Sequence, residues 1–231
     1  MNYVNYYRSW YSDSLDRQSL RVVTEPVEEQ ISLIQAREHL RLDTYGSPPA
    51  HPDDNMIEQV FIPAAREYCE VITARSMVSQ EYEMGLGSFP HAGTVAFWRD
   101  GIAFPLGPVA MVSSITYIDS DGMAQVLPDT EYNVDYYTNA GYIYPAPGTY
   151  WPITQEVPNA VLIRFMAGYS APSASPQDRQ LPRRYRSAML LMLAHLYENR
   201  SQTESGPMVP KEIDLGLHSL LAPDSLRNGF A

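Results

Sequence analysis

The segment 181–200, with the sequence LPRRYRSAMLLMLAHLYENR, constrains the fold of this chain most strongly. Between Ala188 and Leu196, apolar side chains fall on nearly every side of the predicted helix, so a single outward stripe cannot bury them. Pro182 suits a first helical turn, where no N–H is needed, and a polar run follows Arg200. The segment therefore predicts a well-bounded helix over 182–200 that other elements must surround.

Two earlier segments are candidates to cover that helix. Residues 31–42 carry apolar side chains at helical spacing, with Thr24 or Ser32 as suitable cap residues. Residues 53–74 follow a loop rich in Gly, Pro and Asp, and they carry one apolar stripe: Ile57, Val60, Phe61, Ala64, Ala65, Tyr68, Val71 and Ile72. We expect this stripe to pack on helix 182–200, with a core made by Ile57, Phe61, Tyr68, Met189, Met192, Leu193 and Leu196.

From residue 78 the apolar period changes from helical to alternating. Successive alternating segments run to residue 169, separated by turn sequences at Asp100-Gly101, Asp121-Gly122 and 139–141. This pattern predicts antiparallel strands inserted between the second and third helices. The expected fold class is α+β, a small helical core of three main helices with an inserted antiparallel β-sheet.

The length of 231 residues is compatible with one domain flanked by extensions. We expect an N-terminal arm over 1–28, a central domain over 29–200 with the strand insertion at 78–169, and a C-terminal tail over 201–231. The tail contains one more helix candidate, Lys211–Leu221. The arm is dense in aromatic residues, so it either docks on a partner through Tyr7, Trp10 and Tyr11 or packs back on its own domain.

Charge and composition exclude several classes of protein. The formal net charge of −11 repels nucleic acid on average, so we expect any contact with DNA to be local or weak. The single cysteine, Cys69, cannot form an intrachain disulfide or a thiolate metal cluster, and we expect it in the core. Neither a membrane-length apolar run nor a signal peptide pattern is present, which predicts a soluble protein without membrane contact.

The usual motifs of enzymes are missing from the sequence. No GxSxG, GxxxxGK[ST] or HExxH pattern occurs, and His195 is a lone histidine in an apolar helix. The carboxylates at Asp119, Asp121 and 129–131 suit either a hard cation or, as we favour, solvated hairpin turns. We therefore expect no catalysis, no cofactor and no bound metal.

Basic residues gather at the two ends of the third predicted helix. Arg183, Arg184 and Arg186 lie at its start and Arg200 at its end. They are interpreted either as a surface for an acidic protein partner or as ordinary solvated charge. Trp151, in the strand region, is likewise a candidate for a subunit contact or for packing between strands.

Several local strings occur in an order that resembles one protein family. They are LIQAREHLRLD, FIPAAREYCEVITAR, LGPVAMVSSITYIDSDG, AGYSA and LPRRYRSAMLLMLAHLYENR. In this order and spacing they are similar to the head-tail connector (adaptor) proteins of tailed bacteriophages, over about 31–200. The arm and the tail lie outside the resemblance.

The resemblance implies a structural role. Members of the family assemble as a ring, commonly of twelve copies, below the portal protein, where they extend the DNA channel and dock the stopper or tail proteins. It implies that this chain lies in the neck of a virion, after assembly in the host cytoplasm, and that DNA passes without sequence-specific binding. The alternative is a β-rich module that binds a carbohydrate or peptide through Tyr-rich strands, which exposed aromatic residues on one strand face would favour.

Overall fold

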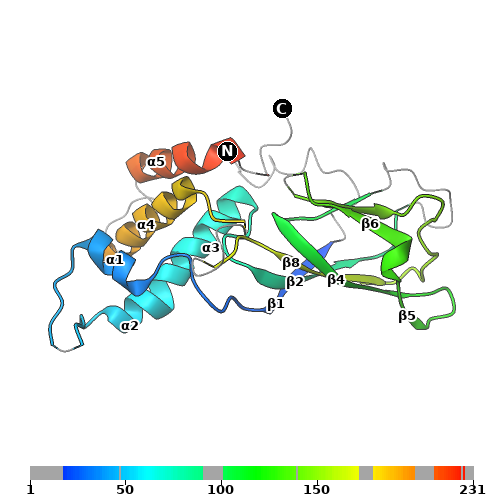
Figure 1. Ribbon diagram of the computed structural model, residues 1–231, viewed down its shortest axis with the longest axis horizontal. Coiled ribbons are helices and arrows are strands. Elements are labelled where there is room, and N and C mark those ends of the chain that lie inside the picture. The colour runs from blue at the N-terminus through cyan, green and yellow to red at the C-terminus, as the bar shows by residue number, and fades with distance from the viewer. Residues whose placement is uncertain are drawn as a thin grey trace. The chain divides into compact units, whose positions relative to one another are not determined.

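The computed structural model describes residues 18–46, 48–90, 101–138, 140–171, 179–200, 211–224 and 226. These residues form two compact units. A sheet unit comprises the described residues of 18–25 and 80–167, and a helical unit comprises those of 26–79 and 168–226. Among the described residues, no helix is long and apolar enough to cross a membrane. Figure 1 shows the helices of the helical unit and the strands of the sheet unit.

The helical unit begins with α1 (Leu33–Leu40). Its N-terminus is a capping box, because the Ser32 side chain accepts a bond from the Gln35 N–H while the Gln35 side chain accepts one from the Ser32 N–H. Arg41, at φ 54, ends the helix in the left-handed conformation. Of the two cap residues that the sequence suggests, the structure uses Ser32.

The second predicted helix is divided by a wider turn. It consists of α2 (Asp54–Met56), a π-helical turn η3 (Ile57–Phe61) and α3 (Ile62–Thr73). Pro63 lies just after the π turn, and a proline within a regular α-helix would remove one bond and clash with the carbonyl four residues earlier. The Ile62 N–H instead bonds to the Ile57 carbonyl, five residues back.

This π turn changes which side chains are buried. Ile57, Ile62, Ala65 and Cys69 are buried, whereas Val60 is 47% exposed and Val71 is 61% exposed. The apolar stripe expected from a regular helix is therefore wrong at both valines. Val60 lies within the π turn itself, and the turn rotates the residues that follow it, Val71 among them. The core position expected for Cys69 is confirmed, and burial raises the pKa of its thiol to about 12.

The helix that the sequence places at the centre is α4 (Arg183–Glu198). Its buried side chains share one core with α1, α3 and α5 (Lys211–Leu221), to which α5 contributes Leu217 and Leu221. In Figure 1, α5 lies along α4. Of the expected core residues, Ile57, Met189, Met192 and Leu193 are buried, and Phe61, Tyr68 and Leu196 are partly buried against them. The all-round apolar character of α4 is thus explained by helices on several of its sides.

The sheet unit contains two antiparallel sheets where the sequence predicts one. The larger has the order β1-β2-β8-β4-β5 and the smaller the order β3-β7-β6. Their strands are β1 (Ser19–Thr24), β2 (Gln80–Leu86), β3 (Ile102–Ala103), β4 (Val109–Ile118), β5 (Ala124–Val126), β6 (Tyr132–Asp135), β7 (Tyr142–Pro145) and β8 (Val161–Ala167). Short 3-10 turns occur at η5 (Asp129–Glu131) and at η6 (Ala222–Asp224) of the helical unit.

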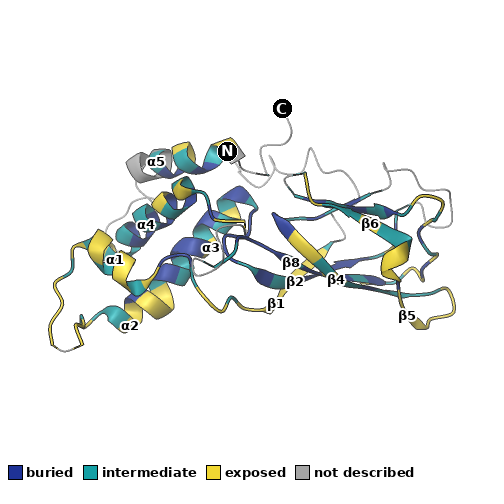
Figure 2. Cartoon of the chain, viewed as in Figure 1, coloured by how far each residue is buried: buried dark blue, intermediate teal, exposed yellow. Residues whose placement is uncertain are grey.

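The core of the sheet unit is shared by the two sheets. Ile102 and Ile143 of the smaller sheet belong to the same buried cluster as Ile115, Ile163 and Phe165 of the larger sheet. Alternation along β8 is regular, with Val161, Ile163, Phe165 and Ala167 inward. The buried positions appear dark blue along these strands in Figure 2.

Strand β1 is a feature that the sequence analysis does not predict, since it lies within the expected arm. It pairs with the edge of β2, and all of its residues are exposed. A row of charges joins three neighbouring strands here: the Glu83 carboxylate accepts bonds from Arg21 Nε at 2.9 Å and from Arg164 Nε at 2.8 Å. The two arginines stabilise the charged form of Glu83 and, against the opposing effect of burial, hold its pKa below the usual value.

Candidate functional site

The end of α4 is attached to the start of α2 by a polar cluster around Asp53. The Asp53 carboxylate accepts bonds from the Tyr197 hydroxyl at 2.7 Å and from Arg200 Nη2 at 2.6 Å. The Arg200 guanidinium also lies over the Tyr197 ring, 4.3 Å from its centre. The terminal YENR of the helix therefore has a structural use within the chain, and Arg200, a candidate for a partner surface, is paired internally.

This cluster has an electrostatic consequence. The hydrogen bond from Arg200, and next that from Tyr197, lowers the pKa of Asp53 from 3.8 to about 2. Burial and the neighbouring Asp53 carboxylate raise the pKa of Tyr197. The charged pair is thus stable at neutral pH, which suits a clamp between helices and does not suit a proton-transfer site.

A second cluster is built around Arg66, which is 6% exposed. Its Nε lies 3.1 Å from both oxygens of Glu29, and its Nη1 donates to Glu70 at 2.8 Å. Glu70 accepts a further bond from the Met77 N–H at 2.7 Å. These contacts connect the segment before α1, the helix α3 and the chain that leaves it, so the AAREYCE string encodes a buried brace of the fold.

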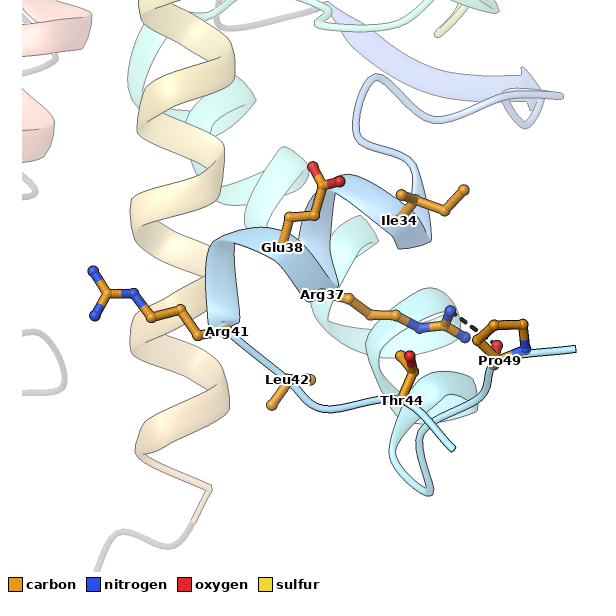
Figure 3. Close-up of a pocket in the computed structure, with 7 residues that line it drawn as sticks. All are labelled: Ile34, Arg37, Glu38, Arg41, Leu42, Thr44 and Pro49. Atoms are coloured by element: carbon orange, nitrogen blue, oxygen red, sulfur yellow. Dashed lines mark hydrogen bonds between the residues drawn. The ribbon is translucent and has the colours of Figure 1, made fainter. Parts of the chain in front are cut away.

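The loop between α1 and α2 is held by Arg37. Its guanidinium is paired with both oxygens of Asp54, and its Nη1 donates to the Pro49 carbonyl at 3.3 Å. Beside it is an open pocket of about 460 Å³ lined by Ile34, Arg37, Glu38, Arg41, Leu42, Thr44 and Pro49. Figure 3 shows Arg37 directed towards Pro49, while Arg41 and Glu38 point away from that contact. The polar groups do not converge on a common point, so the pocket lacks the arrangement of an active site.

The glycine of the AGY string is required by a close approach of two backbones. Gly168 follows β8 at φ +118, and a Cβ there would lie 1.8 Å from the carbonyl oxygen of Val78. No side chain fits at that distance. The resemblance string AGYSA thus also corresponds to a packing requirement.

The arginines at the start of α4 differ in their surroundings. Arg183 is exposed, whereas Arg184 and Arg186 are half-buried, and the Arg184 guanidinium lies 5.2 Å from the centre of the Tyr185 ring. The first turn of α4, described in full, carries no acidic residue and has no side-chain cap. Of these three arginines, only Arg183 is exposed.

Of the aromatic residues proposed as interface candidates, the structure describes only Trp151. Trp151 is 1% exposed and stacks on Phe89 with 4.8 Å between ring centres, so it packs in the core of the sheet unit and offers no surface of its own. The alternative interpretation as packing between strands is the one that the burial supports. Tyr7, Trp10 and Tyr11 lie outside the described residues, as does most of the arm.

The carboxylates of the β4–β5 hairpin hold a turn. Asp119 Oδ1 accepts bonds from the N–H groups of Asp121, at 3.0 Å, and Met123, at 2.8 Å, and Oδ2 accepts one from Gln125 at 2.9 Å. These bonds, first that from Gln125, lower the pKa of Asp119. Its oxygens are thus used by the turn, as the favoured interpretation expects. Within the described part of the chain, no group of His, Cys, Asp and Glu side chains is arranged to bind a metal ion.

Comparison with known proteins gives a consistent result at the level of fold. No protein-family model matches the chain, and no curated protein sequence matches it. A chain from the neck of the empty GTA particle, computed with C6 symmetry, is 24% identical with a TM-score of 0.66, and the match covers 89% of this chain and 94% of that chain. This chain has the fold of a gene transfer agent neck chain.

Two further structures match over a similar extent. A chain from the virion of the native gene transfer agent particle is 24% identical, with a TM-score of 0.64 and coverage of 88% and 93%. A chain from the neck of the native particle, computed with C12 symmetry, is 20% identical, with a TM-score of 0.58 and coverage of 87% and 94%. The expected α+β fold is confirmed, and the likeness to neck chains agrees with the family resemblance of the sequence.

The sequence analysis missed the two acidic partners that organise the helical unit. Asp53 was expected only to favour the start of a helix, and Glu29, the first residue of the expected central domain, was assigned no role. Asp53 lies 147 residues from Arg200 in sequence, so no local spacing could pair them. The sequence offered only an indirect signal. Tyr197 and Arg200 lie at the C-terminal end of an apolar helix, and their polar groups need partners if that end is covered by other segments.

Proposed function

We propose that this chain is a structural head-tail connector of a tailed bacteriophage or phage-like particle. It forms a ring under the portal protein, extends the DNA channel, and docks the stopper or tail proteins. The observation that carries the proposal is the likeness to chains of gene transfer agent necks, and the match covers most of this chain and most of each neck chain. The order of the family strings in the sequence supports it independently.

The chemistry of the described residues is compatible with this role. The polar clusters around Asp53 and Arg66 connect segments of the chain to each other, and their oxygens and guanidinium groups are occupied in doing so. Side chains used in this way make a rigid body, which is what a ring subunit needs under the load of a packed genome. We infer a binding and structural protein, not an enzyme.

Twelve copies is the number that the family resemblance implies. The neck structures that share the fold were computed with C6 and C12 symmetry, and these symmetries are compatible with a ring of that size. The net charge of −11 suits a wall along which DNA slides, because it disfavours tight binding of phosphates. The arm and the tail are proposed to contact the portal and tail proteins, with Tyr7, Trp10 and Tyr11 as contact residues.

Electron microscopy of particles that carry the full chain tests the proposal. We expect a ring of this protein between the portal and the tail, and native mass spectrometry of the chain mixed with portal protein should show a complex of defined copy number. A chain that stays monomeric with the portal, and is missing from purified particles, would refute the proposal. The portal must be present, since a connector subunit can depend on it as a template.

The alternative of a carbohydrate- or peptide-binding module loses its main support. It needs aromatic side chains exposed together on a strand face, but Tyr82 and Trp151 are buried. The exposed tyrosines Tyr136, Tyr137 and Tyr150 lie in loops beyond the strand ends. On the described strands, Tyr117, Tyr132, Tyr142 and Tyr144 are half-buried, and none of them is fully exposed as a platform for a sugar ring.

A further inference from the structure

Strand β1 forms one edge of the larger sheet, and among the described residues no strand pairs with its outer side (Figure 1). All six of its residues are exposed, and its one charge, Arg21, is paired with Glu83 of β2. Natural edge strands are usually very short or carry proline or lysine, because a long uncharged edge attracts other strands. The opposite edge, β5, has only three residues, whereas β1 has six and contains neither proline nor lysine. The edge at β1 is therefore the one that needs a cover.

One face of β1 also continues the core of the sheet unit. Leu20 is opposite Met84 and Val22 is opposite Tyr82, so these side chains lie on the same face of the sheet. Met84 and Tyr82 are buried in the core cluster, but Leu20 is 42% exposed and Val22 is 48% exposed. The apolar face thus extends one strand beyond its cover. A segment that covers this edge should bring apolar or aromatic side chains to that face.

The segment that precedes β1 in the sequence has a composition that suits this edge. Residues 3–11, with the sequence YVNYYRSWY, consist largely of tyrosine, tryptophan and valine, which favour strands. Residues 12–16, with the sequence SDSLD, come next, and serine and aspartate favour turns. A strand-forming run, a short polar run and the strand β1 thus follow one another in the order of a β-hairpin.

We propose that residues 3–11 of the same chain pair with the open edge of β1 and add a strand to the five-stranded sheet. The added strand supplies partners for the N–H and C=O groups of β1 that face away from β2. The connecting segment, 12–17, is short, so the loss of entropy on closing the loop is small. Pairing within one copy is therefore favoured over capture of a strand from a second copy, which has no such tether.

Charge determines which face of the added strand covers the core. Alternate residues of a strand share a face, so Tyr7, Ser9 and Tyr11 lie on one face, and Arg8 and Trp10 lie on the other. The face with Tyr7 and Tyr11 is uncharged and suits the exposed apolar face of β1. Arg8 suits the opposite face of the sheet, where carboxylates and guanidinium groups already alternate between strands. Of the arm residues proposed to contact portal or tail proteins, Trp10 is then the one directed outward.

Hydrogen–deuterium exchange of the isolated full-length chain, measured by mass spectrometry at several protein concentrations, tests the added strand. The comparison is with a chain that lacks residues 2–12. We expect the outward amides of β1 to exchange slower by about tenfold or more in the full-length chain, because several backbone hydrogen bonds are added. The peptide that contains β5, at the opposite edge, should exchange equally in both chains. Tyr7→Asp should speed up exchange at β1 as the truncation does, whereas its matched control, Trp10→Asp, should leave that exchange unchanged.

The hairpin forms within the isolated chain, so this test does not depend on the connector role.

Three outcomes would count against the added strand. Equal exchange at β1 in the full-length and truncated chains would refute it, because the arm would then leave the edge uncovered. Slow exchange that is lost on dilution would also refute it, since the strand would come from a second copy. An effect of Trp10→Asp as large as that of Tyr7→Asp would overturn the assignment of the two faces. In all three cases the connector role is unaffected, because it is tested by the presence of a ring in particles.

Discussion

Replacing Arg66 by methionine tests whether the buried brace stabilises the helical unit as its contacts suggest. The change keeps a long apolar stem but removes the cation that faces Glu29 and Glu70 at 3.1 and 2.8 Å. Removing one partner of a buried ion pair costs about 3 to 5 kcal/mol, because the remaining charge stays buried without compensation. The Glu29 side chain is 24% exposed and can regain water, so we expect a loss of about 3 kcal/mol, at the lower end of that range.

The stability that Arg66→Met loses should be larger at neutral pH than in acid. Burial raises the pKa of Glu70 above its ordinary value of 4.5, and Arg66 is the main group that opposes this shift. A raised carboxyl pKa favours folding below the unfolded value and loses that contribution as pH rises through the folded value. Without Arg66 the pKa of Glu70 rises further, so the deficit of Arg66→Met should be largest at neutral pH and should shrink as pH falls towards 4.5.

Urea denaturation followed by far-UV circular dichroism measures this effect, since the signal is dominated by the helices. Glu67→Gln is the matched control: Glu67 is 66% exposed and 3.7 Å from Arg66, so its removal should change stability by less than about 0.5 kcal/mol. Adding Glu70→Gln to Arg66→Met should recover part of the loss at neutral pH. If Arg66→Met lowered the free energy of unfolding by less than about 1 kcal/mol, or by the same amount at neutral pH and near pH 4.5, the buried ion pairs of Arg66 would not stabilise the fold as described.

Three further predictions concern other parts of the chain. Leu193→Asp buries an unpaired charge at a fully buried position of α4 and should abolish folding. Arg183→Ala, at an exposed position, should leave the melting temperature unchanged. A Leu193→Asp chain that folds would show that α4 is not the central helix of the core. As pH falls from 3.8 to about 2, the wild type should lose folding stability because Asp53 becomes protonated. A lowered carboxyl pKa contributes stability above the unfolded pKa, and that contribution is lost as pH falls through the folded pKa. Urea midpoints measured across this pH range should show the loss in the wild type but not in Asp53→Asn. Gly168→Ala should lower the free energy of unfolding by at least about 3 kcal/mol, because its Cβ would clash with the backbone of Val78. Gly148→Ala, where a Cβ meets nothing within 4 Å, should lower it by about 1 kcal/mol. Equal losses in the two variants would argue against the close approach of Gly168 to Val78.

The parts of the fold that depend on local patterns could be predicted from the sequence. The helix α4 lies within the predicted 182–200, and α5 has the predicted bounds Lys211–Leu221. The strands between 80 and 167 follow the alternating segments, and the Ser32 cap follows from its serine three residues before a glutamine. Each of these depends on side chains within one or two turns of each other, and such distances are visible in sequence spacing.

Long-range geometry was decided by the tertiary structure alone. The π turn before Pro63 rotates α3, so that Ile62 is buried and Val71 exposed, although the sequence pattern fits a regular helix equally well. The burial of Trp151 depends on the stacked Phe89, 62 positions away, and on a second sheet that alternation cannot distinguish from the first. The pairing of Arg200 with Asp53 depends on where two helix ends meet. Local periodicity reports which side of an element is apolar, but only the packed chain determines what lies against that side, because contacts between distant segments leave no regular spacing in the sequence.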